Sequence, residues 1–251
     1  FVRREEEEDP TPVLVAKHRQ SRAARSWVVP RKGAAEAVAA ELGEEGLRAF
    51  GVARGQEVIL KCDNEPAIVA LRERIASRHG GGALLQEPAA HEHESNGVVE
   101  SGVKLSKGML RVLLLALEAR IAGRLPCSHP AFAWLVAHAS AVLTKGLRGK
   151  DGKTPHQRLF GKEVVEEGLE FGEKLRWKPP RGPSHGVLLE ARWHTGIWLG
   201  RHWSGPTHWV FDLATKTLKE CRAIQRVPAS ERWDRVSVES VCVWPRHQEP
   251  T

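Results

Sequence analysis

The sequence has few cysteines and no long apolar run. The cysteines stand singly, with no C-x-x-C pair and no paired histidines to complete a zinc site, so we expect reduced, mostly buried thiols at Cys62, Cys127, Cys221 and Cys242. No apolar segment is long enough to span a bilayer, and the N-terminal FVRREEEEDP lacks both the basic and the apolar region of a signal peptide. We therefore expect a soluble, intracellular protein without membrane contact.

The chain has the size and composition of a globular protein with more than one domain. Its 251 residues are enough for one core of ordinary size and a smaller second module, and 41% hydrophobic with 27% charged residues excludes a disordered chain. The formal net charge of +7 favours a polyanionic partner, although a modest basic excess also occurs in proteins that never meet nucleic acid.

The first two thirds of the chain alternate between strand and helix patterns. We expect strands over 11–17 and 24–29 in a hairpin, a helix over 34–47, a strand over 57–62, a helix from 65, a strand over 83–86, and helices from about 95 to 123 and over 132–143. This order predicts an α/β fold in which helices flank one mixed sheet.

The last third has a different composition. Seven of the nine tryptophans lie beyond residue 170, among short β-prone runs that are separated by glycine and proline. This pattern predicts a small β-barrel or sandwich, in which we expect most tryptophans to be core. Residues 171–251 carry 13 Lys and Arg against 8 Asp and Glu, so most of the basic excess belongs to this module.

Two carboxylates are placed where metal ligands can converge. Asp63 follows a predicted strand, and Glu100 lies in the first turns of the long helix. Carboxylates in these positions suit Mg²⁺, and a pair of such ions can hold the attacking and leaving oxygens of a phosphoryl displacement. The alternative is that Asp63 caps the helix that begins near Glu65 and that Glu100 is an ordinary solvated glutamate.

A basic stripe follows Glu100 on the same helix. Lys104, Lys107 and Arg111 stand four, seven and eleven residues after it, so all four side chains share one face. Such a face can grip DNA phosphates beside a metal ligand. The alternative is a solvated face with an i,i+4 Glu–Lys pair, which is common in helices.

Four motifs, taken together, resemble integrases of retroviruses and retrotransposons. The 36 residues between Asp63 and Glu100 resemble the spacing of the last two members of the family's Asp, Asp, Glu triad, and SNGVVES at 95–101 is similar to the motif around its glutamate. TPHQRLFGK at 154–162 resembles the segment that closes the core in copia-type elements. FG at 171–172, GIWLG at 196–200, VFD at 210–212 and RAIQRV at 222–227 resemble the SH3-like domain that follows.

The resemblance implies a fold, an activity and a set of partners. It implies a ribonuclease H-like core over 1–165, truncated at its N-terminus, an SH3-like β-domain over 166–251, and DNA strand transfer assisted by two Mg²⁺ or Mn²⁺ ions. Element ends and target DNA would be the partners of a homo-oligomer, in the nucleus if the element is eukaryotic. Asn96 and Gly97 would shape the turn before the helix. The implied metal ligands are Asp63 and Glu100, and the implied DNA contacts are Asn96, Lys104, Lys107 and Arg111.

The chain departs from the family pattern at its N-terminus. The family's first aspartate sits on an opening strand, of which Phe1 and Val2 resemble the tail, and Asp9 lies in a polar run that does not suit the role. We therefore expect most of the first strand to be missing and this chain to be a poor catalyst. The alternatives are a degenerate remnant that only binds nucleic acid or a partner through its basic module, and a nuclease acting on RNA in hybrids. His91 and His93 are expected to belong to a loop rather than a metal site.

Overall fold

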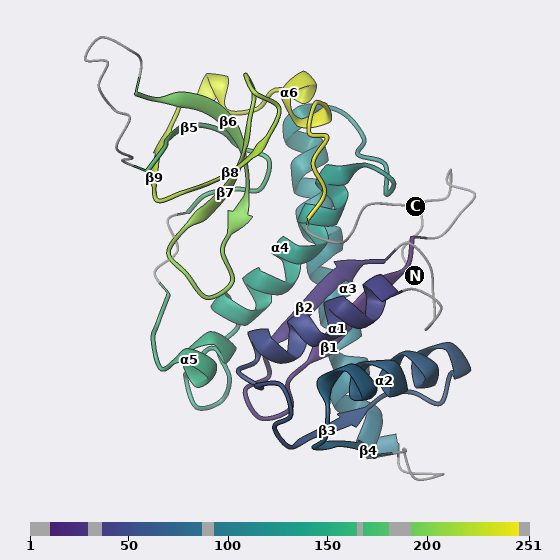
Figure 1. Cartoon of the computed structure of the whole chain (residues 1–251). Coiled ribbons are helices and arrows are strands. Elements are labelled where there is room, and N and C mark those ends of the chain that lie inside the picture. Colours follow the sequence, from purple (N-terminus) through teal and green to yellow (C-terminus); the bar gives the residue numbers. More distant parts are fainter. Residues whose placement is uncertain (1–10, 30–36, 87–92, 165–167, 181–191, 246–251) are drawn as a thin grey trace. The chain divides into compact units, whose positions relative to one another are not determined.

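A computed structural model describes residues 11–29, 37–86, 93–164, 168–180 and 192–245, and the side chains of 93–96 are not included (Figure 1). The chain divides into two compact units. The first unit takes in Phe1–Leu110, Ala139–Val164 and Arg246–Thr251, and the second takes in Arg111–His138 and Val165–Pro245. The domain bounds expected from the sequence stay a prediction.

The first unit opens with the predicted hairpin. Strands β1 (Val13–Lys17) and β2 (Ala24–Val28) pair antiparallel, with Val13 opposite Val28 and Lys17 opposite Ala24. In the turn, Ser21 Oγ lies 2.8 Å from His18 Nδ1 and accepts from the Ala23 amide at 3.2 Å. Arg22 adopts a φ of 66°, so the turn stores some backbone strain. The hairpin expected from the two β-prone segments is confirmed.

Helix α4 (Pro130–Gly146) covers the outer edge of β2 with hydroxyl groups. Thr144 Oγ1 accepts from the Ala24 amide at 3.0 Å and donates to the Ala24 carbonyl at 3.0 Å, and Ser140 Oγ accepts from the Ser26 amide at 3.1 Å. Thr144 and Ser140 are both buried. The side chains of α4 therefore take the place of a neighbouring strand along this edge, which satisfies backbone groups that burial would otherwise penalise.

Thr144→Val is expected to lower the free energy of unfolding by about 1–3 kcal/mol, because it leaves both polar groups of buried Ala24 without a partner. The measurement is urea denaturation combined with hydrogen exchange of the Ala24 amide, which should speed up. Thr144→Ser is the matched control, since it keeps the hydroxyl and should keep that amide protected. An unchanged exchange rate in Thr144→Val would contradict the assignment.

A second, parallel pair of strands follows in the same unit. Strands β3 (Val58–Lys61) and β4 (Ala83–Gln86) pair in register, Val58 with Ala83 and Lys61 with Gln86, and α2 (Pro66–His79) connects them. The expectation of a single mixed sheet is wrong in this respect. The described strands of this unit form two separate sheets, one antiparallel pair and one parallel pair. Among the described strands, none joins the β1-β2 pair to the β3-β4 pair by backbone hydrogen bonds.

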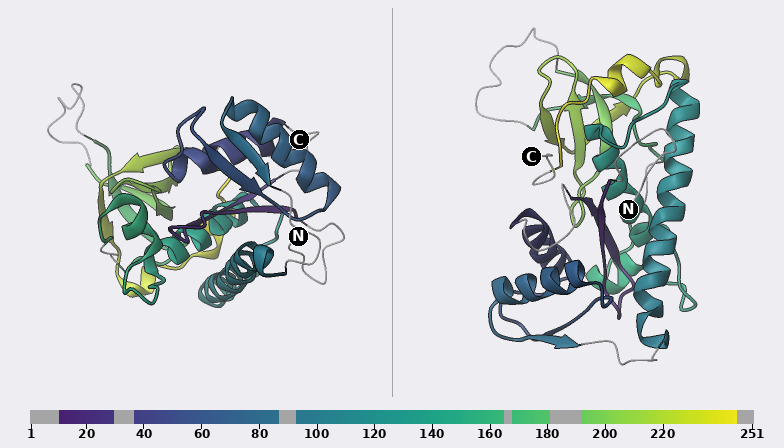
Figure 2. Two further views of the ribbon diagram at one scale, coloured as in Figure 1. Left: turned by 90° about the horizontal axis from the view of Figure 1, so that it is seen from below. Right: turned by 90° about the vertical axis from the view of Figure 1, so that its right-hand side faces the viewer.

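The helices fall close to their predicted places. Helix α1 (Ala37–Ala49) follows the hairpin, α3 (His93–Ile121) is one continuous helix, best seen in the right panel of Figure 2, and α5 (Pro155–Phe160) was not predicted. Thr154 caps α5 in a reciprocal arrangement with Gln157, a capping signature visible in the sequence. None of the helices in the described ranges has the length and apolarity needed to cross a bilayer.

The second unit contains a five-stranded antiparallel sheet. Its strands are β5 (Lys174–Lys178), β6 (His194–Arg201), β7 (His208–Asp212), β8 (Leu218–Cys221) and β9 (Ala223–Arg226), in the spatial order β8-β7-β6-β5-β9. A 3₁₀ turn η1 (Ala229–Glu231) and the short helix α6 (Arg235–Glu239) follow. The predicted β-rich module is confirmed as an antiparallel sheet, and closure into an SH3-like barrel stays a prediction.

The core of this sheet satisfies its polar tryptophan groups internally. Trp177 Nε1 donates to Asp212 Oδ2 at 2.9 Å, and Trp198 Nε1 donates to His208 Nδ1 at 3.2 Å, and all four residues are buried. Burial acts to raise the pKa of Asp212, but hydrogen bonds from Thr215 and Trp177 outweigh it and lower that pKa. These two tryptophans are core residues, as expected, whereas Trp193 is 39% exposed.

Candidate functional site

Asp63 lies two residues beyond the end of β3, at the entrance to α2. Its side chain is exposed, and no described residue pairs with it through an ion pair or hydrogen bond. Helix α2 begins at Pro66 with Glu65 as its N-cap residue, and no side chain caps it. The alternative role for Asp63, as a helix cap, is therefore not realised in the structure, and the carboxylate is free to bind something else.

The strand end next to Asp63 is held by a buried arginine. Arg72 is 6% exposed and donates from Nη1 to the Gln86 carbonyl at 3.0 Å, which ties α2 to the end of β4. Partial burial raises the pKa of the Cys62 thiol, with Arg72 acting against this rise and Asp63 adding to it. Cys62 is therefore a protonated structural thiol at neutral pH and not a nucleophile.

Glu100 lies on an exposed face of α3 together with the basic stripe. Glu100, Lys104, Lys107 and Arg111 are all exposed, and none of them forms an ion pair with another described residue. The i,i+4 pair between Glu100 and Lys104 is not formed, whereas the exposure of all four side chains agrees with the alternative of a solvated face. One carboxylate and three cations are thus presented to solvent without compensation.

A neighbouring face of α3 is the buried one. Leu110, Leu117 and Ile121 are 5%, 2% and 5% exposed, and Val99 and Val103 are half-buried. These residues recur at helical spacing, roughly 60–100° around the helix from Glu100. Their burial fixes which side of the helix carries Glu100.

The structure corrects the expected turn before this helix. Helix α3 begins at His93, so Asn96 and Gly97 are helical and do not form a turn. A run without proline, next to good helix formers, lets the helix extend toward its N-terminus. The side chain of Asn96 lies outside the described part, as do His91 and Asp9, so its contact with DNA stays a prediction.

Lys17 of β1 is a neighbour of α3 that the sequence did not indicate. Its Nζ donates to Ser101 Oγ at 3.2 Å, and its Cδ would lie 2.8 Å from a Cβ added at Gly102. Burial and the nearby charge of Arg22 lower the pKa of Lys17. The end of β1 therefore packs on α3 one residue beyond Glu100. Lys17 and Ser101 are 84 positions apart, and no periodicity in either segment predicts their contact.

The described carboxylates do not form a complete metal cluster. Within the described ranges, no group of three or more His, Cys, Asp and Glu side chains is placed to hold a metal ion. Asp63 and Glu100 belong to the same compact unit. The donor atoms are of the right kind for Mg²⁺, which commonly uses one or two carboxylates and completes its shell with water and substrate phosphate.

Comparison with known proteins gives a distant structural likeness. No protein-family model matches the sequence, and no curated protein matches it. Among solved structures, the chain is similar to the catalytic core domain of BIV integrase in crystal form I, with a TM-score of 0.44 and 21% identity over 61% of this chain and 88% of that chain. This likeness is too distant to assign a role to any residue of this chain.

Proposed function

We propose that this chain is the catalytic core and following β-domain of a copia-type retrotransposon integrase, which joins DNA ends to a target by strand transfer. The observation that carries the proposal is the exposed, uncompensated set Asp63, Glu100, Lys104 and Lys107 in the first unit. A carboxylate and a lysine can pair when a helix presents them at i,i+4 spacing. Their lack of pairing leaves both signs of charge available to metal ions and phosphates.

In this proposal the two carboxylates bind divalent ions. Asp63 and Glu100 offer oxygen ligands without competing lysine or arginine partners, which suits Mg²⁺ or Mn²⁺. The bound ions would supply charge neutralisation at the attacking and leaving oxygens of the phosphodiester. Further ligands have to come from water, from DNA phosphates or from outside the described residues, and the described chain alone is expected to be a poor catalyst.

The remaining parts of the proposal concern partners. Lys104, Lys107 and Arg111, with Asn96 before them, would contact phosphates of the element end and target DNA, because their charges face solvent and are not neutralised within the chain. The five-stranded sheet would be the core of an SH3-like domain. The working assembly would be a homo-oligomer on DNA, in the nucleus if the element is eukaryotic, and sedimentation with and without DNA tests this.

Glu100→Gln is expected to lower the rate of DNA end joining by about 1,000-fold, because it removes the charge of one metal ligand while keeping its shape. The assay joins labelled DNA ends to a target in Mg²⁺ and, separately, Mn²⁺. It uses the full chain. Mn²⁺ binding, followed by electron paramagnetic resonance, should weaken in the same variant.

Glu57→Gln is the matched control, since Glu57 is also an exposed glutamate near β3 but lies at the opposite end of that strand from Asp63. It should join DNA at the parent rate. If Glu100→Gln joins DNA as fast as Glu57→Gln, the assignment of Glu100 as a metal ligand is wrong.

A second candidate function is nucleic-acid binding without catalysis. It is favoured by the lack of a cluster of three or more possible metal ligands in the described residues. If this function is right, the chain does not join DNA. The double variant Lys104→Ala with Lys107→Ala should still reduce the slope of log duplex affinity against log salt by about 0.9 per lysine. Lys150→Ala, at an exposed loop lysine, is the charge-matched control.

A further inference from the structure

The outer face of β5, β6 and β9 in the second unit is polar and basic. Arg176 lies opposite Thr195 of β6 and Gln225 of β9, and all three are exposed. Directly opposed residues project from the same side of a sheet. Their neighbours Leu175 and Trp177 are 0% and 4% exposed and fill the other side. None of the three strands contains an acidic residue, so nothing on them offsets the positive charge.

The cations of this face are not offset by neighbouring carboxylates. Arg176, Lys178 and Arg222 form no ion pair with another described residue. By contrast, Arg226 binds Glu173 and Arg235 binds Glu239. Three uncompensated cations gathered on one face offer a binding surface for an anionic ligand.

An exposed tryptophan stands beside these cations. Trp193 is 39% exposed and is the only exposed one of the nine tryptophans, all of which lie in described ranges. Lys178 Nζ lies 5.9 Å from the centroid of its ring. A large apolar ring left in water beside lysine and arginine offers a flat surface on which a nucleic-acid base can stack.

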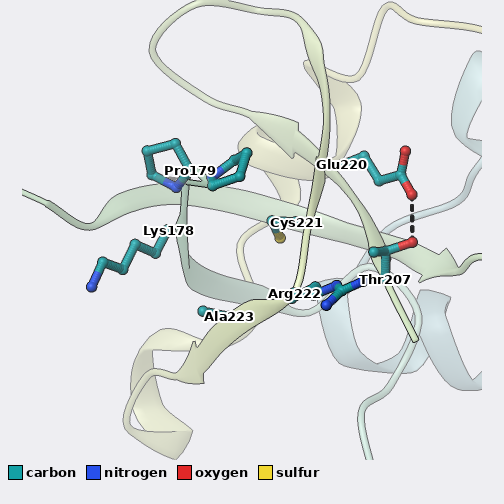
Figure 3. A pocket seen from close by; sticks show the side chains of 8 residues that line it. Lys178, Pro179, Thr207, Glu220, Cys221, Arg222 and Ala223 are labelled. Atoms are coloured by element: carbon teal, nitrogen blue, oxygen red, sulfur yellow. Dashed lines mark hydrogen bonds between the residues drawn. The ribbon is translucent and has the colours of Figure 1, made fainter. Parts of the chain in front are cut away.

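A pocket of about 450 Å³ opens at the end of the same face (Figure 3). Lys178, Pro179 and Ala223 line one part of it, and Arg222, Thr207 and Glu220 line another. Thr207 Oγ1 donates to Glu220 Oε1 at 2.5 Å, so the pocket's carboxylate already has a partner. The volume lies within the usual range of small-ligand pockets, about 300–1,000 Å³. Apolar proline and alanine beside two cations suit a base with its phosphate.

We propose that this face binds single-stranded nucleic acid, with phosphates on Arg176, Lys178 and Arg222, one base stacked on Trp193 and a neighbouring base in the pocket. Single strands fit because their bases have free faces, whereas the bases of a duplex stack on one another. The site lies wholly within the second unit and does not depend on the proposed strand transfer.

The test measures binding of a fluorescently labelled oligothymidylate, about 12 nucleotides long, to the full chain over a range of salt concentrations. Trp193→Ala is expected to weaken binding by about 5- to 100-fold, and Trp193→Phe should recover most of it because it keeps a ring. Arg176→Ala and Arg222→Ala should each reduce the slope of log affinity against log salt by about 0.7.

Arg235→Ala removes the same charge from a paired arginine on α6 and should leave both affinity and slope unchanged. Near-ultraviolet circular dichroism of each variant verifies folding. The proposal is overturned if folded Trp193→Ala binds like the parent, or if a duplex or an acidic peptide competes as well as the oligothymidylate. Loss of binding in Lys104→Ala with Lys107→Ala would also overturn it, since the ligand would then lie on α3.

Discussion

Replacing Arg226 with alanine is expected to lower the free energy of unfolding of the second unit by about 3–5 kcal/mol. Arg226 donates from Nε and Nη2 to the two carboxylate oxygens of Glu173, at 2.6 and 2.7 Å. Glu173 is 0% exposed, and its other cation, Arg232, lies at 3.6 Å. Removing Arg226 therefore leaves a buried carboxylate with one distant cation, which is far costlier than losing a surface ion pair.

The measurement is denaturation by urea, followed by tryptophan fluorescence and far-ultraviolet circular dichroism. The double variant Arg226→Leu with Glu173→Leu should lose less stability than Arg226→Ala alone, because it removes the charge that needs compensation. Arg235→Ala is the control for an exposed pair, since Arg235 and Glu239 are 54% and 40% exposed, and it should cost little. A loss below about 1 kcal/mol in Arg226→Ala would mean that water reaches Glu173.

Trp27→Ala is expected to destabilise the first unit by about 3–5 kcal/mol, because it opens a large cavity in the core of that unit. Trp27 is 1% exposed and packs in one cluster with Leu42 and Leu71, at 0% and 4%. Leu42 belongs to α1 and Leu71 to α2, so this cluster brings the indole of β2 together with side chains from both helices. The measurement is the urea midpoint, read by far-ultraviolet circular dichroism.

Gly46 of α1 gives this prediction a stringent internal test. A Cβ at Gly46 would lie 2.9 Å from Trp27 Cη2, so Gly46→Ala should be destabilising although alanine favours helices. In a Trp27→Phe background the outer ring is gone, and Gly46→Ala should then become neutral or stabilising. If Gly46→Ala costs the same in both backgrounds, Trp27 and Gly46 are not in contact.

Local patterns predicted most elements of the first unit. Two β-prone runs on either side of a polar stretch predicted the hairpin, and Pro66 predicted the start of α2. The face shared by Glu100 and Lys104 was predicted from helical spacing, and exposure of both confirms that face. Each of these follows from residues within a few turns of one another, where backbone geometry alone relates the side chains.

Other features could not be predicted because they join distant segments. Thr144 bonds to Ala24 across 120 positions, and Lys17 bonds to Ser101 across 84. Neither hydroxyl differs in sequence context from an ordinary surface serine or threonine. The start of α3 was placed too late, and α5 was missed although Thr154 and Gln157 carried a capping signature.

The sequence by itself determined the periodic elements, the basic stripe of α3 and the β-rich character of the last third, because apolar spacing and turn residues act locally. Only the tertiary structure decided that Asp63 caps nothing, that Glu100 and Lys104 stay unpaired, and that unpaired cations surround Trp193. The physical reason is that burial and pairing depend on which distant segments pack together. Compensation of a charge is a property of its neighbours in space.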